Sequence, residues 1–263
     1  MKKWLLILLT LALTMGALPA KTKTMSIENF EKEVWRLTNV ERTRYSLRPL
    51  IYEPGLVKLA RYHSQNMQQR NFFAHRDPQG YDIADRRKHY YPTLVVSCVG
   101  ENIGRFRNSA GTFTPQELVA GWMNSPSHRE NILHPDYTHL GVGIVRDANT
   151  LYATQNFATP LVKIKTEVSK EISIQKPYRV SFEYLSPNQR DRLSCTLIYP
   201  DRTKTFKVSE KQEMVGAQPL KLEWVSASKF DILVPLEAGS GDYKLCFGFD
   251  NGYFPEGIVL KAK

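Results

Sequence analysis

Several features are scarce in this sequence of 263 residues, and each scarcity excludes a class of protein. Three cysteines are too few for a domain held together mainly by disulfides. The hydrophobic fraction of 42% is too high for a disordered chain. The formal net charge of +10 is spread along the chain and forms no long block, so we expect a solvated basic surface and no nucleic-acid partner.

Long hydrophobic runs are also missing after residue 20, since a membrane-spanning helix takes roughly 20 apolar residues. The first 20 residues are the exception. Lys2 and Lys3 precede the apolar run 4–15 and the small residues 16–20, which is the pattern of a secretory signal peptide. We therefore expect a signal peptide over 1–20, a secreted, extracellular or periplasmic protein, and no transmembrane segment in the mature chain.

Helical and strand patterns divide the remainder into two domains, with a boundary expected at Thr159-Pro160. Apolar spacing and capping residues predict helices over 27–45, 54–70, from 114 and over 126–133, a loop-rich stretch over 72–100, and strands at 140–145 and 151–157. Period-two runs predict an all-β, immunoglobulin-like sandwich with strands at 168–174, 178–184, 193–199, 203–208, 220–225, 230–235, 243–249 and 257–260. The prediction is an α+β protein with a mixed domain over 27–160 and a β-sandwich over 161–263.

The cysteines fit this division. Cys195 and Cys246 lie in two predicted strands of the sandwich, so an oxidising compartment predicts a disulfide between these strands. Cys98 is left over and is interpreted as a buried free thiol.

Histidine is confined to one part of the chain, because all six lie between His63 and His139. His63 is on the apolar face of the second predicted helix, which favours a hydrogen-bonded core residue over a ligand. The trio His128, His134 and His139 does not match the common zinc spacing. We expect His89, His134 and His139 to be surface residues.

His128 has a more informative place than the other two members of the trio. If Ser125 is the N-cap and Pro126 the first helical residue, His128 lies in the first turn, where the helix macrodipole disfavours a positive charge. A neutral imidazole is the form that ligates metal or accepts a proton. In an alternative frame Ser127 is the N-cap and Glu130 closes a capping box.

Four segments carry a joint pattern: residues 60–67 running into 72–80, Gly100-Glu101-Asn102-Ile103, 121–133 leading to 141–143, and 154–158. In this order and spacing they resemble bacterial members of the CAP superfamily, the SCP-like extracellular domain of cysteine-rich secretory proteins, antigen 5 and pathogenesis-related 1 proteins. The resemblance covers about residues 28–158. It implies an α-β-α sandwich with a surface cavity lined by two histidines and usually two acidic residues.

The resemblance also implies which residues line that cavity. By position, His75 and His128 are its two histidines and Glu101 is its first carboxylate. The second carboxylate falls on Ser125, so this chain departs from the usual set. Two neutral imidazoles can hold a divalent metal such as zinc, and Glu101 could orient a histidine, ligate the metal or act as base to a bound water. Gln155 and Asn156 are expected to be inward-facing amides of the cavity wall.

Several functions follow from the resemblance. The first is a binding protein without established enzymatic activity, whose cavity takes a small apolar ligand such as a sterol or other lipid, a divalent metal, or a cell-envelope component. The alternative is a metal-dependent, protease-like hydrolase that uses His75, His128 and Glu101. A nucleophile at Ser125 or Ser64 is disfavoured because neither lies in an elbow motif. In a third interpretation the sandwich is an adhesin-like domain.

Overall fold

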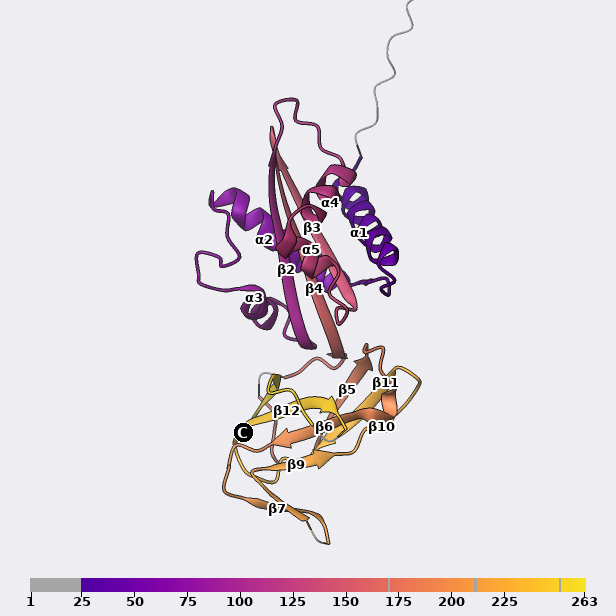
Figure 1. Cartoon of the computed structure of the whole chain (residues 1–263). Helices are drawn as coiled ribbons and strands as arrows, with labels where there is room; N and C mark the ends of the chain where they lie inside the picture. Colours follow the sequence, from indigo (N-terminus) through magenta and orange to yellow (C-terminus); the bar gives the residue numbers. More distant parts are fainter. Residues whose placement is uncertain (1–24, 170, 211, 251) are drawn as a thin grey trace, which may run out of the picture.

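The computed structural model describes residues 25–169, 171–210, 212–250 and 252–263, so the predicted signal peptide lies outside the described residues. Figure 1 shows a layered domain of helices and strands above a domain of strands. Within the described ranges, no helix is both long and apolar enough to cross a membrane.

The order of elements is that of the predicted α+β class. The first domain contains α1 (Ile27–Arg44), β1 (Ile51–Tyr52), α2 (Pro54–Gln69), α3 (Ile83–Tyr90), β2 (Leu94–Arg107), α4 (Pro115–Met123), α5 (Pro126–Ile132), β3 (His139–Asp147) and β4 (Thr150–Ile164). The second contains β5 (Tyr178–Tyr184), a 3-10 turn (Arg190–Arg192), β6 (Leu193–Ile198), β7 (Thr205–Ser209), β8 (Gln212–Val215), β9 (Ala217–Leu220), β10 (Glu223–Trp224), β11 (Lys229–Val234), β12 (Gly241–Phe249) and β13 (Gly257–Ala262).

Capping residues and a proline determine where helices α4 and α5 begin. Thr114 caps α4 and forms a reciprocal capping box with Glu117, as its sequence predicts. Helix α5 begins at Pro126 with Ser125 as the N-cap, so the alternative start at Ser127 is wrong. The Ser125 side chain makes no capping hydrogen bond, and the fixed φ of Pro126 starts this helix instead.

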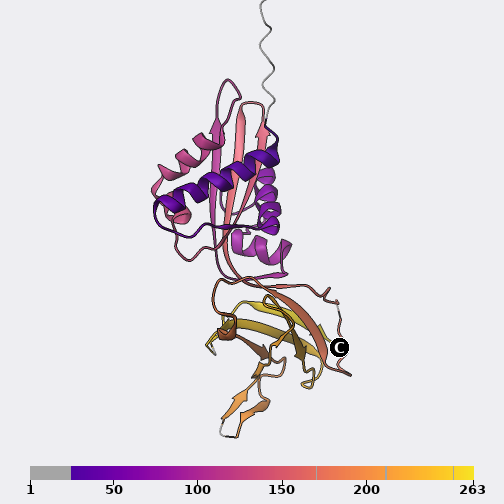
Figure 2. The same cartoon turned by 90° about the vertical axis from the view of Figure 1, so that its right-hand side faces the viewer.

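Strand β3 explains how the first domain becomes three layers. A Cβ on Gly141 would lie 2.2 Å from the backbone of Leu56, and one on Gly143 would lie 2.1 Å from the backbone nitrogen of Arg61, so both glycines permit close packing of α2. The alternate residues of β3 face the opposite side. There they join a core from α1, α4 and β4 that includes Phe30, Val34, Leu118, Trp122 and Phe157. Figures 1 and 2 show α1 and α2 on opposite faces of the sheet.

The segment 72–100 is more ordered than its turn signals predict, because it contains α3 and the first half of β2. Strand β2 pairs with β4 from Leu94↔Lys163 to Arg107↔Thr150. Residues 94–96 are all buried, so the strand begins without the alternation of polar and apolar residues that would have revealed it.

Strand β4 runs through the boundary expected at Thr159-Pro160 and continues to Ile164. Pro160 is tolerated in it because the register of β2 shifts on both sides of its partner Val96. The last residues of β4 pair with β5. One sheet, ordered β1-β3-β4-β5-β11-β10 with β2 also on β4, therefore extends through both domains.

The second domain is a sandwich in which the sheet β13-β12-β6-β9 packs against the β5-β11-β10 end of the first sheet. The ring of Phe182 lies 5.2 Å from that of Phe230 and 5.1 Å from that of Phe247, between centroids. The strand predicted at 168–174 is wrong: the described residues of this range, 168, 169 and 171–174, form no strand, and Ile172 makes an isolated parallel bridge to Ala262.

The predicted disulfide is also wrong, because Cys195 and Cys246 are free. They lie on neighbouring strands of one sheet, where Cys195 is opposite Phe247 and Cys246 is opposite Thr196. Successive residues of a strand point to opposite faces, so Cys195 shares the core face with Phe247 while the Cys246 thiol points to the other face. Two thiols on opposite faces of a sheet cannot bond without moving the backbone. Cys98 is also free and half-buried.

Candidate functional site

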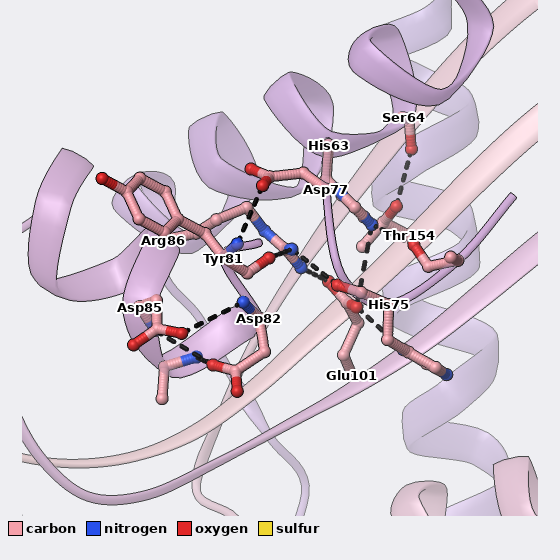
Figure 3. Close-up of polar contacts among 12 residues, drawn as sticks. His63, Ser64, His75, Asp77, Tyr81, Asp82, Asp85, Arg86, Glu101 and Thr154 are labelled. Carbon is pink, nitrogen blue, oxygen red and sulfur yellow. Dashed lines mark hydrogen bonds and ion pairs between the residues drawn. The ribbon is translucent and has the colours of Figure 1, made fainter. Parts of the chain in front are cut away.

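The site is centred on Glu101, a buried carboxylate on β2 (Figure 3). Its Oε1 lies 2.9 Å from Nδ1 of His75 and 3.8 Å from Nε2 of His63. Its Oε2 accepts a hydrogen bond from Nη2 of Arg86. Both carboxylate oxygens are therefore engaged, and the charge of Glu101 is compensated inside the domain by a buried guanidinium.

Arg86 is a residue of this site that the sequence did not reveal. It lies on α3, is fully buried, and donates from Nη1 to the carbonyls of His75 at 2.7 Å and Tyr81 at 2.8 Å. Asp77 helps to shape the same loop by accepting from the backbone of Gln79 and of Tyr81. Arg86 thus fixes both the carboxylate and the loop that carries His75. Its sequence signal was weak, since it lies in a basic run of a turn-rich segment.

His63 is the buried core histidine that its helical position predicts. Its Nε2 donates to the carbonyl of Ala74 at 3.1 Å, which joins α2 to the loop before His75. Burial lowers the pKa of His63, so the ring is held neutral. Beside it, Ser64 hydrogen-bonds to the carbonyl of Gly143 and to Thr154, which gives this serine a structural role.

His75 is the exposed member of the site, with 56% of its side chain accessible. Because Nδ1 donates to Glu101, the neutral ring carries its lone pair on Nε2. The buried carboxylate therefore sets both the tautomer and the orientation of an accessible imidazole.

His128 is half-buried on the first turn of α5. Burial, and then the charge of His75, lower the pKa of His128 and favour its neutral form. A network holds this turn against β2: Asn102 donates to the carbonyl of His128 at 3.0 Å, and Asn131 donates to the side chain of Asn102 at 2.9 Å and to the carbonyl of Glu101 at 3.2 Å. The structure thus brings His75, Glu101 and His128 to one part of the domain.

The other predicted residues have mixed outcomes. Gln155 is inward-facing as predicted, and its amide bonds to Thr38 and Asn102. Ser125 is the half-buried N-cap of α5, three residues before His128. The surface prediction for His139 is wrong: it is 2% exposed at the start of β3, between β1 and β4, and burial lowers its pKa to about 4.

The donor set determines what metal chemistry these residues permit. Within the described ranges, no group of three or more His, Cys, Asp or Glu side chains is arranged to hold a metal. His75 Nε2 and a ring nitrogen of His128 are suitable donors, whereas Glu101 is engaged by His75 and Arg86. Catalytic zinc sites use three protein ligands. His75 and His128 together offer two imidazole nitrogens, one fewer than such a site, and Glu101 orients one of the two rings.

Comparison with known proteins gives a family match in the first domain and relatives that cover part of the chain. The model of the CAP family, described as the cysteine-rich secretory protein family, matches residues 35–157. The uncharacterized protein YkwD of Bacillus subtilis is 40% identical over 124 residues, which are 47% of this chain and 46% of that protein. The uncharacterized membrane protein YlbC of the same organism is 35% identical over 127 residues, 48% of this chain and 34% of that protein. This chain thus covers less than half the length of either relative.

Solved structures align with a similar share of the chain. An extracellular protein containing an SCP domain from Bacillus anthracis has 31% sequence identity and a TM-score of 0.43, covering 50% of this chain and 42% of that chain. An outer surface protein from Borrelia burgdorferi has 18% identity and a TM-score of 0.45, covering 52% of this chain and 96% of that chain. Together, the family match, the four sequence segments and the α-β-α layers show that residues 35–157 belong to the CAP family, and that this chain joins a CAP domain to a carboxy-terminal β-sandwich.

Proposed function

We propose that this chain is an exported binding protein whose CAP domain takes up a divalent metal ion such as Zn²⁺ through His75 and His128. The observation that carries the proposal is the 2.9 Å contact between Nδ1 of His75 and Oε1 of a buried Glu101. This contact gives an exposed imidazole the tautomer and orientation of a metal ligand. Export is supported by the signal-like sequence of residues 1–20 and by the secretory family of the domain.

In its neutral form, each histidine supplies one unprotonated ring nitrogen as a metal ligand. The hydrogen bond from Nδ1 to Glu101 leaves the lone pair of the neutral His75 ring on its accessible Nε2. Partial burial keeps His128 neutral by lowering its pKa. A bound metal would supply a Lewis acid with open positions for water or a further ligand, such as a component of the cell envelope.

A metal-dependent hydrolase has less support from the same residues. Glu101 would have to leave Arg86 or His75 before it could act as a base toward bound water. Its burial and its two partners suit an orienting group better than a mobile proton acceptor. The polar character of this site also gives less support to the binding of a sterol or other lipid at His75 and His128. An adhesin-like role of the sandwich remains a prediction.

Calorimetric titration of the purified chain with ZnCl₂ tests the proposal. We expect His75→Ala with His128→Ala to remove binding. His89→Ala is a matched control in the same domain, because this histidine is exposed and lies outside the site. Thermal unfolding of each variant verifies that the fold is kept. Zinc binding that is unchanged in the double variant would contradict the proposed function.

A further inference from the structure

A second candidate site lies between the two domains and shares no residue with the His75–Glu101–His128 site. It is a pocket of about 830 Å³. On the CAP side the pocket is lined by the end of α3, the beginning of β2 and the last residue of β4. On the sandwich side it is lined by Lys244 of β12 and by residues 254–259, which lead into β13. This volume is within the range of small-molecule sites, roughly 300–1,000 Å³.

The pocket contains a buried cation with a free donor. Arg87 is 3% exposed, and its Nη1 donates to the carbonyl of Leu94 at 2.8 Å. Its Nη2 forms an ion pair with Glu256 of the sandwich. Its Nε has no hydrogen-bond partner among the residues that the structure describes. A buried guanidinium N–H without an acceptor costs free energy, so an acceptor that entered the pocket would be stabilised there.

The rest of the lining combines positive charge with apolar surface. Lys88 and Lys244 join Arg87, so three cations face the single carboxylate of Glu256. The other lining residues are mostly apolar and come from both domains: Pro92, Val96, Ile164, Val168, Phe254 and Ile258. Such a site suits a molecule with one negative end and an apolar body.

We propose that this pocket binds a small organic anion with an apolar body, whose anionic group bonds to Arg87 in competition with Glu256. The guanidinium edge formed by Nε and Nη2 can take both oxygens of a carboxylate or a similar anion. The body of the ligand would lie against Val96 of the CAP domain and Ile258 of the sandwich. An occupant would thus contact both domains and stabilise their arrangement.

Two probes with the same aromatic body and different charge test the ligand class. Titration of the full chain with 1-naphthaleneacetate and with 1-naphthaleneethanol, followed by calorimetry, compares an anion with a neutral analogue. We expect the anion to bind at least about tenfold more tightly, because a hydrogen bond to a charged group contributes about 1.5–3 kcal/mol. Equal affinity for the two probes would overturn the proposal.

Variants of the pocket distinguish a binding site from a structural ion pair. Glu256→Gln removes the competing carboxylate, so we expect it to tighten binding of the anion by several-fold. Thr93→Trp should fill the pocket and abolish binding. Lys244→Ala should weaken it, whereas Lys165→Ala is a matched control, since that lysine pairs with Glu183 outside the pocket.

Affinity that Glu256→Gln leaves unchanged or lowers would overturn the proposal, because a purely structural ion pair gives no gain when it is broken. Binding of the anion by Thr93→Trp with unchanged affinity would also overturn it. Zinc titration of the same variants separates this proposal from the function proposed for the CAP site, because none of the substitutions touches His75 or His128.

Discussion

The CAP domain and the sandwich bury different kinds of side chain. Among the described residues, every buried polar or charged side chain except Thr196 lies in the CAP domain. The sandwich core instead closes on aromatic rings, including Phe182, Phe230 and Phe247. Both domains bury apolar surface, but the CAP domain also buries polar groups, and each of these must find a specific partner.

Arg42 illustrates the difference. It is fully buried on α1 and donates to the carbonyls of Ile132 and His134, both at 2.8 Å, and of Tyr137 at 3.3 Å. These bonds fix the end of α5 and the segment that follows it. A buried cation needs contacts of this kind to offset the loss of its hydration, so the polar core positions its elements more specifically than apolar contact alone would.

The largest effect that would test this contrast is a loss of aromatic packing in the sandwich. We expect Phe247→Ala to lower the free energy of unfolding by about 3–5 kcal/mol, because it leaves a cavity among rings that are otherwise in contact. Urea unfolding measures the loss, and hydrogen exchange followed by mass spectrometry locates it. If hydrogen exchange became faster only in the CAP domain, the sandwich core would not depend on Phe247, and the prediction would be contradicted.

The CAP domain should respond to acid through a buried histidine. The pKa of His139 is lowered to about 4 by burial, from an ordinary value of 6.5. Between these two pH values the histidine is protonated in the unfolded chain but not in the folded chain. The free energy of unfolding therefore falls as the pH falls, by about 1.4 kcal/mol per pH unit for this group. We expect His139→Gln to reduce the slope of stability between pH 6.5 and pH 4.

The exposed His89 provides the control for this measurement, since His89→Gln should leave the slope unchanged. Some slope will remain in His139→Gln because burial also lowers the pKa of His63 and of His128. A slope identical to that of the parent chain would show that His139 is not held neutral in the folded domain.

The smallest expected effect concerns the cysteines of the sandwich. Because Cys195 and Cys246 point to opposite faces of one sheet, a reductant should not change the midpoint of thermal unfolding. If a disulfide were present, its reduction would lower the free energy of unfolding by about 2–5 kcal/mol. Alkylation of the denatured, unreduced chain should label all three cysteines. If only one cysteine were labelled, the other two would be joined in a disulfide, and this interpretation would be contradicted.

The predictions that succeeded rest on local patterns. The capping box at Thr114 and the proline at position 126 determine where α4 and α5 begin, since a cap depends on residues within one turn. Arg86 and His139 escaped prediction because an isolated charged or polar residue shows no local sign of burial. Their surroundings come from elements distant in the sequence: β2 provides Glu101 for Arg86, and β1 and β4 flank His139.

The sequence by itself determined the α+β order of elements, the segments of the CAP family and the restriction of histidine to one domain. Periodicity, capping and motif spacing encode these features within short stretches. Only the tertiary structure decided that Glu101 is held by Arg86, that Cys195 and Cys246 face away from each other, and that a pocket containing Arg87 lies between the domains. Strand register and the packing of remote elements set the directions of these side chains, and neither can be read from residues that are neighbours in the chain.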